Sequence, residues 1–571
     1  MFARVIPLLK TPTGVNGFDY RIPEGLALEP GDLVVVPFRK HRLVGVVGEL
    51  LKTSPFSAKA ASIMHRYGEV RFPPSFLALL AWTAERTFSS QPTVLHAWLR
   101  ALPKRPADGA FRPTISTEQE TSHILTHWTA TPQQELLERV RVLQETKKRI
   151  LIVTPWKARV ERVHTQIPGS LCLQSDQNMG DFAATWQQFI QNEEGVLITT
   201  RIGAWLMCLA DETLIDEPEN DDHKQDDLTP RYDVRKLAAW FATIQKGSLE
   251  TFGITPALHV QVPAPSIPAE VRVFIQHPQG RSQIPCVQAD TLQEFVDHEG
   301  PRVIIHPIRG VLARLVCRDC GWQAICPTCA YPLALEEQGA LCRLCHKHIP
   351  LASDCPHCGS MDLGKSFPGI DRLKQAWARI YPEIEVTWRD LTNEQMDAPF
   401  APNTFVLVTL TSLLGGAVED IRRHERQCVA LRRLAARVGE AKGVLALQGE
   451  ETEVTRWLSW LTTEGVQALF EQERASRLLF RYPPSVRRVK LLLDLPEPEA
   501  DTFISSLVKL LPPSITSDGP FHVQYGTPGQ RKRLVYHLIV PADVPEAQLI
   551  HLLSPFAKQI KIDLDPIAFF K

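Results

Sequence analysis

The chain is 571 residues long, 44% apolar and 22% charged, with a formal net charge of −1. A chain of this length can form several domains with sizeable cores, and its composition is that of a soluble globular protein. The near-zero net charge excludes a broadly basic chain, so any contact with nucleic acid must come from local basic patches. The N-terminal segment lacks the long apolar core of a signal peptide, and no apolar run indicates a membrane span, so we expect a cytoplasmic protein.

Residues 1–105 form the first predicted domain. Strand-like runs at 2–10 and 33–50 flank a segment rich in proline and glycine, and helical spacing of apolar residues predicts two short helices within 74–102. A small basic cluster lies beside the second strand run: Arg39, Lys40 and Arg42. A solvated hairpin is the simpler explanation of this cluster, and a phosphate contact is the alternative.

Residues 106–120 are predicted to be a linker, and residues 121–265 an α/β lobe. An amphipathic helix around 135–148 precedes the buried-strand runs RILIVTP, GVLITTR and ETLIDE, which is typical of a parallel sheet. A phosphate-binding loop before that helix would need glycines and a Lys-Ser/Thr pair. The segment THWTATPQQE has neither. Asp216 and Glu217 could belong to a metal–nucleotide site, but without such a loop we interpret them as remnants that cap the edge of the sheet.

A second α/β lobe is predicted from residues 266–312 and 362–455, and a cysteine-rich insert at 313–361 interrupts it. The insert contains four Cys-x-x-Cys pairs, and the two thiolates of each pair can bind one metal ion from a tight turn. Four pairs supply two closed four-cysteine sites, which is the arrangement of structural zinc. A disulfide-rich or redox module and an iron–sulfur cluster are the alternatives.

The last two features are basic. The helix predicted at 422–437 carries six arginines, diluted by Glu419, Glu425 and Glu440, and it suits a salt-bridged surface helix as well as a DNA contact. Residues 470–571 have the order βαββαβ, which predicts a ferredoxin-like α+β domain. A hairpin of this domain contains three basic residues, which could contact phosphate or form an exposed turn: Arg531, Lys532 and Arg533.

Several segments resemble the PriA family of bacterial replication-restart helicases. The order FDYRIPEGL, GDLVVVPF and VGVVGEL is similar to the start of that family, and CRDCGWQAICPTC with LCRLCHKHIPLASDCPHCGS is similar to its cysteine insert. The resemblance implies a multidomain α/β protein with a β-rich 3′-DNA-end-binding domain, two superfamily 2 helicase (RecA-like) lobes and the C-terminal domain. The family's winged helix is missing, because the predicted linker is too short to form it.

The resemblance also implies roles for particular residues. Phe18 would stack on a terminal base and Asp19 would accept a hydrogen bond from the sugar 3′-hydroxyl, with Tyr20 beside them in the DNA-binding segment. Arg39 replaces a glycine that the family often has. The family's interleaved pairing gives one Zn²⁺ to each of two cysteine sets: Cys317, Cys320, Cys355 and Cys358, and Cys326, Cys329, Cys342 and Cys345.

Several helicase motifs depart from the family pattern together. Gln133 and Gln134 replace the Lys-Thr pair of the phosphate loop, and Glu440 replaces the last arginine of the family's QVAGRAGR motif. Arg437 is then the single candidate arginine finger. We therefore expect two Zn²⁺ ions as cofactors, and we do not expect Mg²⁺ and ATP to drive unwinding.

The sequence thus predicts a PriA-like replication restart protein. We expect it to bind branched DNA and stalled forks with a 3′ end, and to nucleate primosome assembly at the nucleoid. The implied partners are primosome proteins, a helicase loader or replicative helicase, and single-stranded DNA-binding protein, with no membrane. An active ATP-dependent 3′–5′ DNA helicase with an atypical nucleotide site and a zinc-dependent protein-interaction scaffold are the alternatives.

Overall fold

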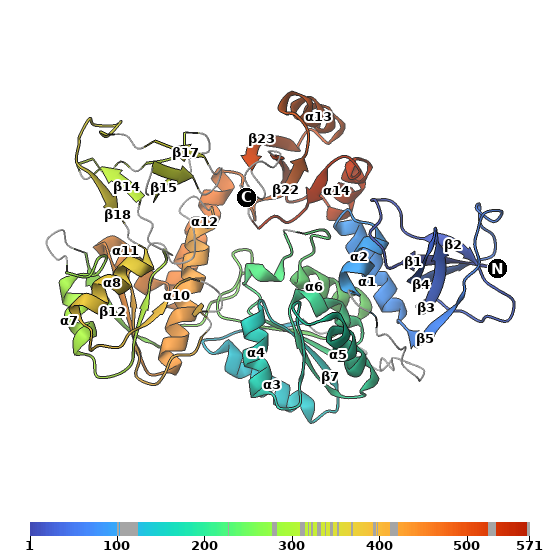
Figure 1. Cartoon of the computed structure of the whole chain (residues 1–571), viewed down its shortest axis with the longest axis horizontal. Helices are drawn as coiled ribbons and strands as arrows, with labels where there is room; N and C mark the ends of the chain where they lie inside the picture. The colour runs from blue at the N-terminus through green and yellow to red at the C-terminus, as the bar shows by residue number, and fades with distance from the viewer. Residues whose placement is uncertain are drawn as a thin grey trace.

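A computed structural model shows a multidomain α/β architecture, as predicted (Figure 1). An N-terminal antiparallel unit is followed by two parallel α/β lobes, a small cysteine-rich insert beside the second lobe, and a C-terminal antiparallel unit. The structure describes residues 1–99, 102, 124–226, 228–276, 282–308, 314–317, 319–320, 322, 324–327, 333–336, 339–342, 347–350, 353–366, 369–391, 395–396, 398–411, 421–523 and 533–567. The predicted linker at 106–120 lies outside these residues.

The N-terminal unit is a five-stranded antiparallel sheet of order β2-β1-β4-β3-β5, followed by two helices. Its elements are β1 (Phe2–Pro7), β2 (Phe18–Arg21), β3 (Asp32–Phe38), β4 (His41–Leu51), β5 (His65–Arg71), α1 (Pro74–Arg86) and α2 (Gln91–Trp98). The strands are buried on both faces, because Val5 and Val34 belong to one core while their neighbours Ile6 and Leu33 belong to another. This explains why the strands have apolar runs rather than strict alternation.

The first lobe is a six-stranded parallel sheet of order β6-β11-β10-β7-β9-β8. Its strands are β6 (Ile124–Trp128), β7 (Arg149–Val153), β8 (Leu171–Leu173), β9 (Gly195–Thr199), β10 (Glu212–Asp216) and β11 (Leu249–Gly253). Its helices are α3 (Pro132–Gln144), α4 (Lys157–Gln166), α5 (Met179–Gln191), η1 (Arg201–Cys208), η2 (Asp221–His223) and α6 (Val234–Gln245). The strands β7 and β10 are buried along their whole length, as expected for a sheet with helices on both faces.

The second lobe is a five-stranded parallel sheet of order β12-β21-β20-β13-β19. Its strands are β12 (Glu270–Ile275), β13 (Arg302–Ile305), β19 (Thr387–Arg389), β20 (Phe405–Val408) and β21 (Val444–Gly449). Its helices are α7 (Ala289–Asp297), α8 (Ile370–Ile380), α10 (Arg423–Glu440), α11 (Glu451–Ser459) and α12 (Thr463–Leu479). The helix α10 lies on the side of this lobe that faces the first lobe, and α12 rises from the lobe towards the C-terminal unit (Figure 1).

The insert and the C-terminal unit are both antiparallel. The insert contains β14 (Arg314–Cys317) paired with β18 (Leu363–Ser366), and a second sheet of β15 (Leu333–Glu336), β16 (Gly339–Cys342) and β17 (His348–Ile349). The C-terminal sheet has the order β23-β24-β22-β25, so its elements follow a β-α-β-β-α-β order along the chain. They are β22 (Val486–Leu493), α13 (Glu497–Leu510), β23 (Thr516–Val523), β24 (Arg533–Pro541), α14 (Glu546–Leu553) with η4 (Ser554–Phe556), and β25 (Lys561–Asp563).

The units are joined by packing and by ion pairs. Trp82 of α1 stacks on Trp240 of α6 with ring centroids 5.0 Å apart, and one apolar core continues from the first sheet into the first lobe. Two acids of the C-terminal segment bind the first lobe: Lys224 contacts Asp563 at 2.8 Å, and Lys236 pairs with Asp565. None of the described helices combines the length and apolar character needed to cross a membrane.

Candidate functional site

The end-binding residues predicted from the sequence lie on β2 at the edge of the first sheet. Phe18 is partly buried, and its ring lies 5.3 Å from that of Phe38 at an angle of 55°. The carboxylate of Asp19 is only 3% exposed, so it is held inside this edge rather than displayed on the surface. An aromatic ring can stack on a base, and a fixed carboxylate can accept a hydrogen bond from a hydroxyl group, in both cases without reading sequence.

Two residues that the sequence did not single out hold this carboxylate. Arg4 lies directly opposite Asp19 in the pairing of β1 with β2, and its Nε contacts Oδ1 at 3.0 Å. Ser54 donates from Oγ to Oδ2 at 2.7 Å. Each carboxylate oxygen can accept more than one hydrogen bond, so both oxygens keep capacity for an incoming hydroxyl group. The sequence signal for Arg4 is a charged residue within the otherwise apolar strand FARVIP.

Arg39 has a backbone conformation that favours glycine. Its φ is +56°, in the left-handed region, which agrees with its place where the resembling family often has glycine. Its guanidinium carbon lies 5.7 Å from the centroid of the Phe38 ring. The positive charge therefore lies next to the aromatic ring that contacts Phe18, where it can approach a phosphate group.

The remaining predicted DNA contacts lie elsewhere. Tyr20 is 4% exposed and packs in the core beneath the first sheet, where burial raises the pKa of its hydroxyl group. Arg531 and Lys532 lie outside the described residues. Arg533 begins β24, and its side chain also lies outside what the structure describes.

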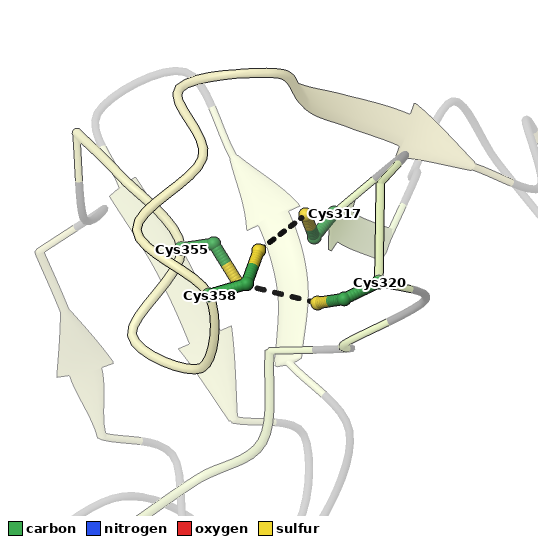
Figure 2. Close-up of side chains that lie close together, drawn as sticks. All are labelled: Cys317, Cys320, Cys355 and Cys358. Carbon is green, nitrogen blue, oxygen red and sulfur yellow. Dashed lines mark hydrogen bonds between the residues drawn. The ribbon is translucent and has the colours of Figure 1, made fainter.

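The first predicted cysteine set comes together in the insert. Cys317 ends β14, and Cys355 and Cys358 belong to a turn before β18, so antiparallel pairing brings the two segments together. The sulfur atoms of Cys317 and Cys358 lie 3.6 Å apart, as do those of Cys320 and Cys355 (Figure 2). All four sulfurs lie within 4.8 Å of one another. Such a cluster of soft thiolate ligands could hold one metal ion.

The second predicted set is described only in part. Cys326 and Cys342 are 1% and 0% exposed and belong to the same small core of the insert. Cys329 and Cys345 lie outside the described residues. The two cysteines that are described are thus buried in the insert, as ligands of a structural site would be.

The phosphate-loop position of the first lobe has a different structure. The strand β6 ends at Trp128 and α3 begins at Pro132, so three residues connect them. Within that connection, the N–H of Thr129 bonds to the carbonyl of Gly253 at 3.0 Å, and the N–H of Thr131 bonds to Thr129 Oγ1 at 3.2 Å. A proline at the start of α3 removes another donor. With two N–H groups bonded within the protein and neither glycine nor lysine among its residues, this connection does not fit a nucleoside triphosphate.

The acidic residue at the end of β10 already has a partner inside the protein. Arg159 of α4 binds both oxygens of Asp216, from Nε at 2.6 Å and from Nη2 at 3.0 Å. Neither side chain is more than 2% exposed. A third nitrogen of Arg159, Nη1, donates to Gln133 Oε1 at 2.9 Å. Asp216 and Gln133, which the resemblance places at the family's Mg²⁺ and phosphate positions, are therefore bound to one arginine.

The stability of the protein should depend on pH through His223, which lies next to Asp216. Its ring is fully buried, and Nε2 donates to the carbonyl of Asp216 at 2.8 Å. Burial, and then the charge of Arg235, lower the pKa of His223 to about 4 from an ordinary value of 6.5. Between these values the unfolded chain binds more protons, so the stabilisation by neutral His223 is present above pH 6.5 and disappears as the pH falls towards 4.

We expect this histidine to account for roughly 3 kcal/mol of the stability lost between pH 7 and pH 4. Free energies of unfolding for the wild type and His223→Gln at several pH values would measure it. The variant should show a smaller loss between pH 6.5 and 4.5, above the window in which carboxylates titrate. Parallel curves in that window would contradict the prediction.

Both the first unit and the whole chain are similar to known proteins. A family model described as a PriA 3′ DNA-binding domain (3′BD) matches residues 8–100, which include Phe18 and Asp19. Replication restart protein PriA of Rickettsia felis is 21% identical over 99% of this chain and 100% of its own length. Together these matches support membership of the PriA family.

Other PriA proteins match shorter parts. The PriA of Bacillus subtilis is 20% identical over 67% of this chain and 54% of its own length. The PriA of Haemophilus influenzae is 31% identical over 80 residues, which cover 14% of this chain and 11% of that protein. The edge strand that carries Phe18 and Asp19 thus lies in the part of the chain that the family model covers.

Proposed function

We propose that this PriA-family chain is a replication restart protein that binds branched DNA and stalled forks through a 3′ end, without ATP-driven unwinding. The observation that supports it best is the Asp19 carboxylate, which Arg4 and Ser54 hold on the edge strand β2, one residue after Phe18. A sugar 3′-hydroxyl would donate to this carboxylate while the terminal base stacks on the Phe18 ring. Tyr20 would support the strand from below, and the basic residues at 531–533 would contact phosphate.

The other units have structural and assembly roles in this proposal. We propose that the chain divides into the end-binding domain at 1–105, helicase-like lobes at 121–265 and at 266–312 with 362–455, the insert at 313–361, and a ferredoxin-like domain at 470–571. The insert would hold two Zn²⁺ ions with the cysteine sets described above. The whole chain would act at the nucleoid as a scaffold for primosome proteins, a helicase loader or the replicative helicase, and single-stranded DNA-binding protein.

Binding to labelled forks tests the proposal. We expect the wild type to prefer a junction with a 3′-hydroxyl over one with a 3′-phosphate, because Asp19 accepts from the first and repels the second. Asp19→Asn should reduce this preference by about tenfold, which is the expected size for loss of a hydrogen bond to a charged group. Fluorescence anisotropy with both forks measures the preference, and ATP turnover is followed in the same samples.

Glu24→Gln is the matched control, since Glu24 is an exposed acid of the same domain. It should leave both the affinity and the preference unchanged. If the wild type does not distinguish the two ends, the pocket has another function and the insert becomes the first candidate for partner binding. Fork-stimulated ATP turnover would instead support the atypical helicase.

A further inference from the structure

The cleft between the two lobes contains a network of opposite charges that runs along α10. On the first-lobe side, three acids follow β10 at alternate positions: Glu217, Glu219 and Asp221. On the second-lobe side, four arginines lie at helical spacing on or just before α10: Arg422, Arg426, Arg433 and Arg437. In Figure 1, α10 lies between the second lobe, to which it belongs, and the first lobe.

The deeper half of the network joins two arginines to two glutamates. Arg433 Nη2 lies 3.2 Å from Glu217 Oε2 and 3.2 Å from Glu219 Oε1. Arg437 Nη2 lies 3.2 Å from the other oxygen of Glu217. Both glutamate side chains are 4% exposed, so water screens these pairs little.

The outer half uses Asp221. Arg422 Nη1 lies 3.0 Å from its Oδ1, and Arg426 Nη2 lies 2.8 Å from its Oδ2. Arg426 also donates to the carbonyl of Ile567 at 2.9 Å, which brings the C-terminal segment into the same network. Every arginine–acid pair in both halves joins residues 201 to 220 positions apart in the sequence, so each one connects separate units of the fold.

A neighbouring arginine fixes the connection between the lobes from the inside. Arg432 is fully buried, and its Nε donates to Thr255 Oγ1 at 3.0 Å while Nη2 donates to the carbonyl of Ile254 at 3.2 Å. Its Nη1 donates to the carbonyl of Trp460 at 2.8 Å. The segment that leaves the first lobe after β11 is therefore bound to the second lobe through α10.

The ionisation of the acids agrees with this arrangement. Burial alone would raise the pKa of Glu217, but Arg433, Arg159 and Arg437 together lower it to about 2. Burial raises the pKa of Glu219, which shares Arg433 with Glu217. Burial is likewise outweighed at Asp221, whose pKa is lowered by Arg422 and Arg426. Glu217 and Asp221 are thus charged at neutral pH, as a network of ion pairs requires.

Mg²⁺ and ATP do not fit this cleft. A 1130 Å³ pocket extends from Gln133 and Gln134 of α3 to Arg437 and Glu440 of α10, and a 430 Å³ pocket lies on the other side of Arg437. A triphosphate entering either space would have to compete with Glu217 for Arg437, and in the smaller space for Arg433 as well. It would find neither a lysine in the phosphate-loop connection nor a carboxylate at Asp216 that is open to a metal ion.

We propose that the cleft between the lobes is a permanent ion-pair interface. Arginines of α10 and acids after β10 take the place that a bound nucleotide would have. The lobes then keep one fixed relative position, and binding of Mg²⁺ and ATP does not change it. The inference concerns the cleft alone and does not depend on which DNA the proposed end-binding pocket accepts.

Hydrogen–deuterium exchange on the full chain tests the ion-pair interface between the lobes. We expect peptides covering 212–223 and 423–440 to exchange at the same rate with and without millimolar Mg²⁺ and ATP. In the double variant Glu217→Gln with Glu219→Gln, both peptides should exchange at least tenfold faster, while peptides from 534–540 should not change. Glu138→Gln is the control, because Glu138 lines the larger pocket and accepts a hydrogen bond from Gln134 of its own helix.

A second variant disrupts the network from the other lobe. Arg433→Met with Arg437→Met should speed exchange in the same two peptides, and this variant decides the matter if the glutamate variant does not fold. Nucleotide-dependent exchange in the wild type, or unchanged exchange in the folded variants, would overturn the proposal. Fork binding is measured separately. A wild type whose exchange does not change with nucleotide, and which also fails to bind forks, would refute the proposed function but support the ion-pair interface.

Discussion

Substitution of Cys355 by serine is expected to remove about one equivalent of bound metal and to unfold the insert. The four sulfurs lie within 4.8 Å of one another, and they can all ionise to thiolates only around a cation, because thiolates this close would otherwise repel one another. Structural zinc supplies about 10–16 kcal/mol of apparent binding free energy in small zinc domains, which is far more than the small core of this insert can provide. Metal content of the purified chain and proteolysis within 313–361 measure the two effects.

Cys286→Ser is the matched control for this experiment. Cys286 lies outside the insert, and burial raises the pKa of its thiol to about 12, so it remains a neutral thiol. Its substitution should leave the metal content unchanged. Unchanged metal in Cys355→Ser would show that these sulfurs hold no ion. Preference for a 3′-hydroxyl should survive in Cys355→Ser, because the Asp19 pocket lies in a different unit of the chain.

Short sequence patterns were sufficient to predict the cysteine ligands and the strand β10. The spacing of the cysteine pairs predicts ligands before any fold is known, because two thiolates in one turn need only local geometry. The buried-strand run ETLIDE likewise predicts β10, with Asp216 at its end. Both signals depend on residues only a few positions apart.

Partners distant in sequence could not be found in this way. The pairing of Arg4 with Asp19 depends on the register between β1 and β2, which turn geometry and core packing determine together. Similarly, the basic helix at 422–437 suited both a salt-bridged helix and a DNA contact, because its charges alone do not identify what they face. The structure places the acids of the first lobe opposite it.

The buried pair of Arg159 and Asp216 leads to the other large prediction. We expect Asp216→Ala to lower the free energy of unfolding of the first lobe by about 3–5 kcal/mol, because it leaves a buried guanidinium without its carboxylate. Replacing both partners, with Arg159→Met and Asp216→Leu, should recover most of that loss, since two apolar side chains of similar volume leave no unpaired charge. Chemical denaturation followed by exchange in β7 and β10 measures the stability of this lobe.

An exposed ion pair on the same helix provides the control. Lys157 of α4 contacts Asp176 at 2.5 Å, but both side chains are more than half exposed. Asp176→Ala should therefore lower the stability of the lobe far less than Asp216→Ala does, because water screens an exposed pair. If Asp216 instead served a metal–nucleotide site, its loss would abolish ATP turnover and leave the stability of the lobe nearly unchanged. A large loss of stability in a protein without ATP turnover would mean that the carboxylate of Asp216 acts in the fold through Arg159.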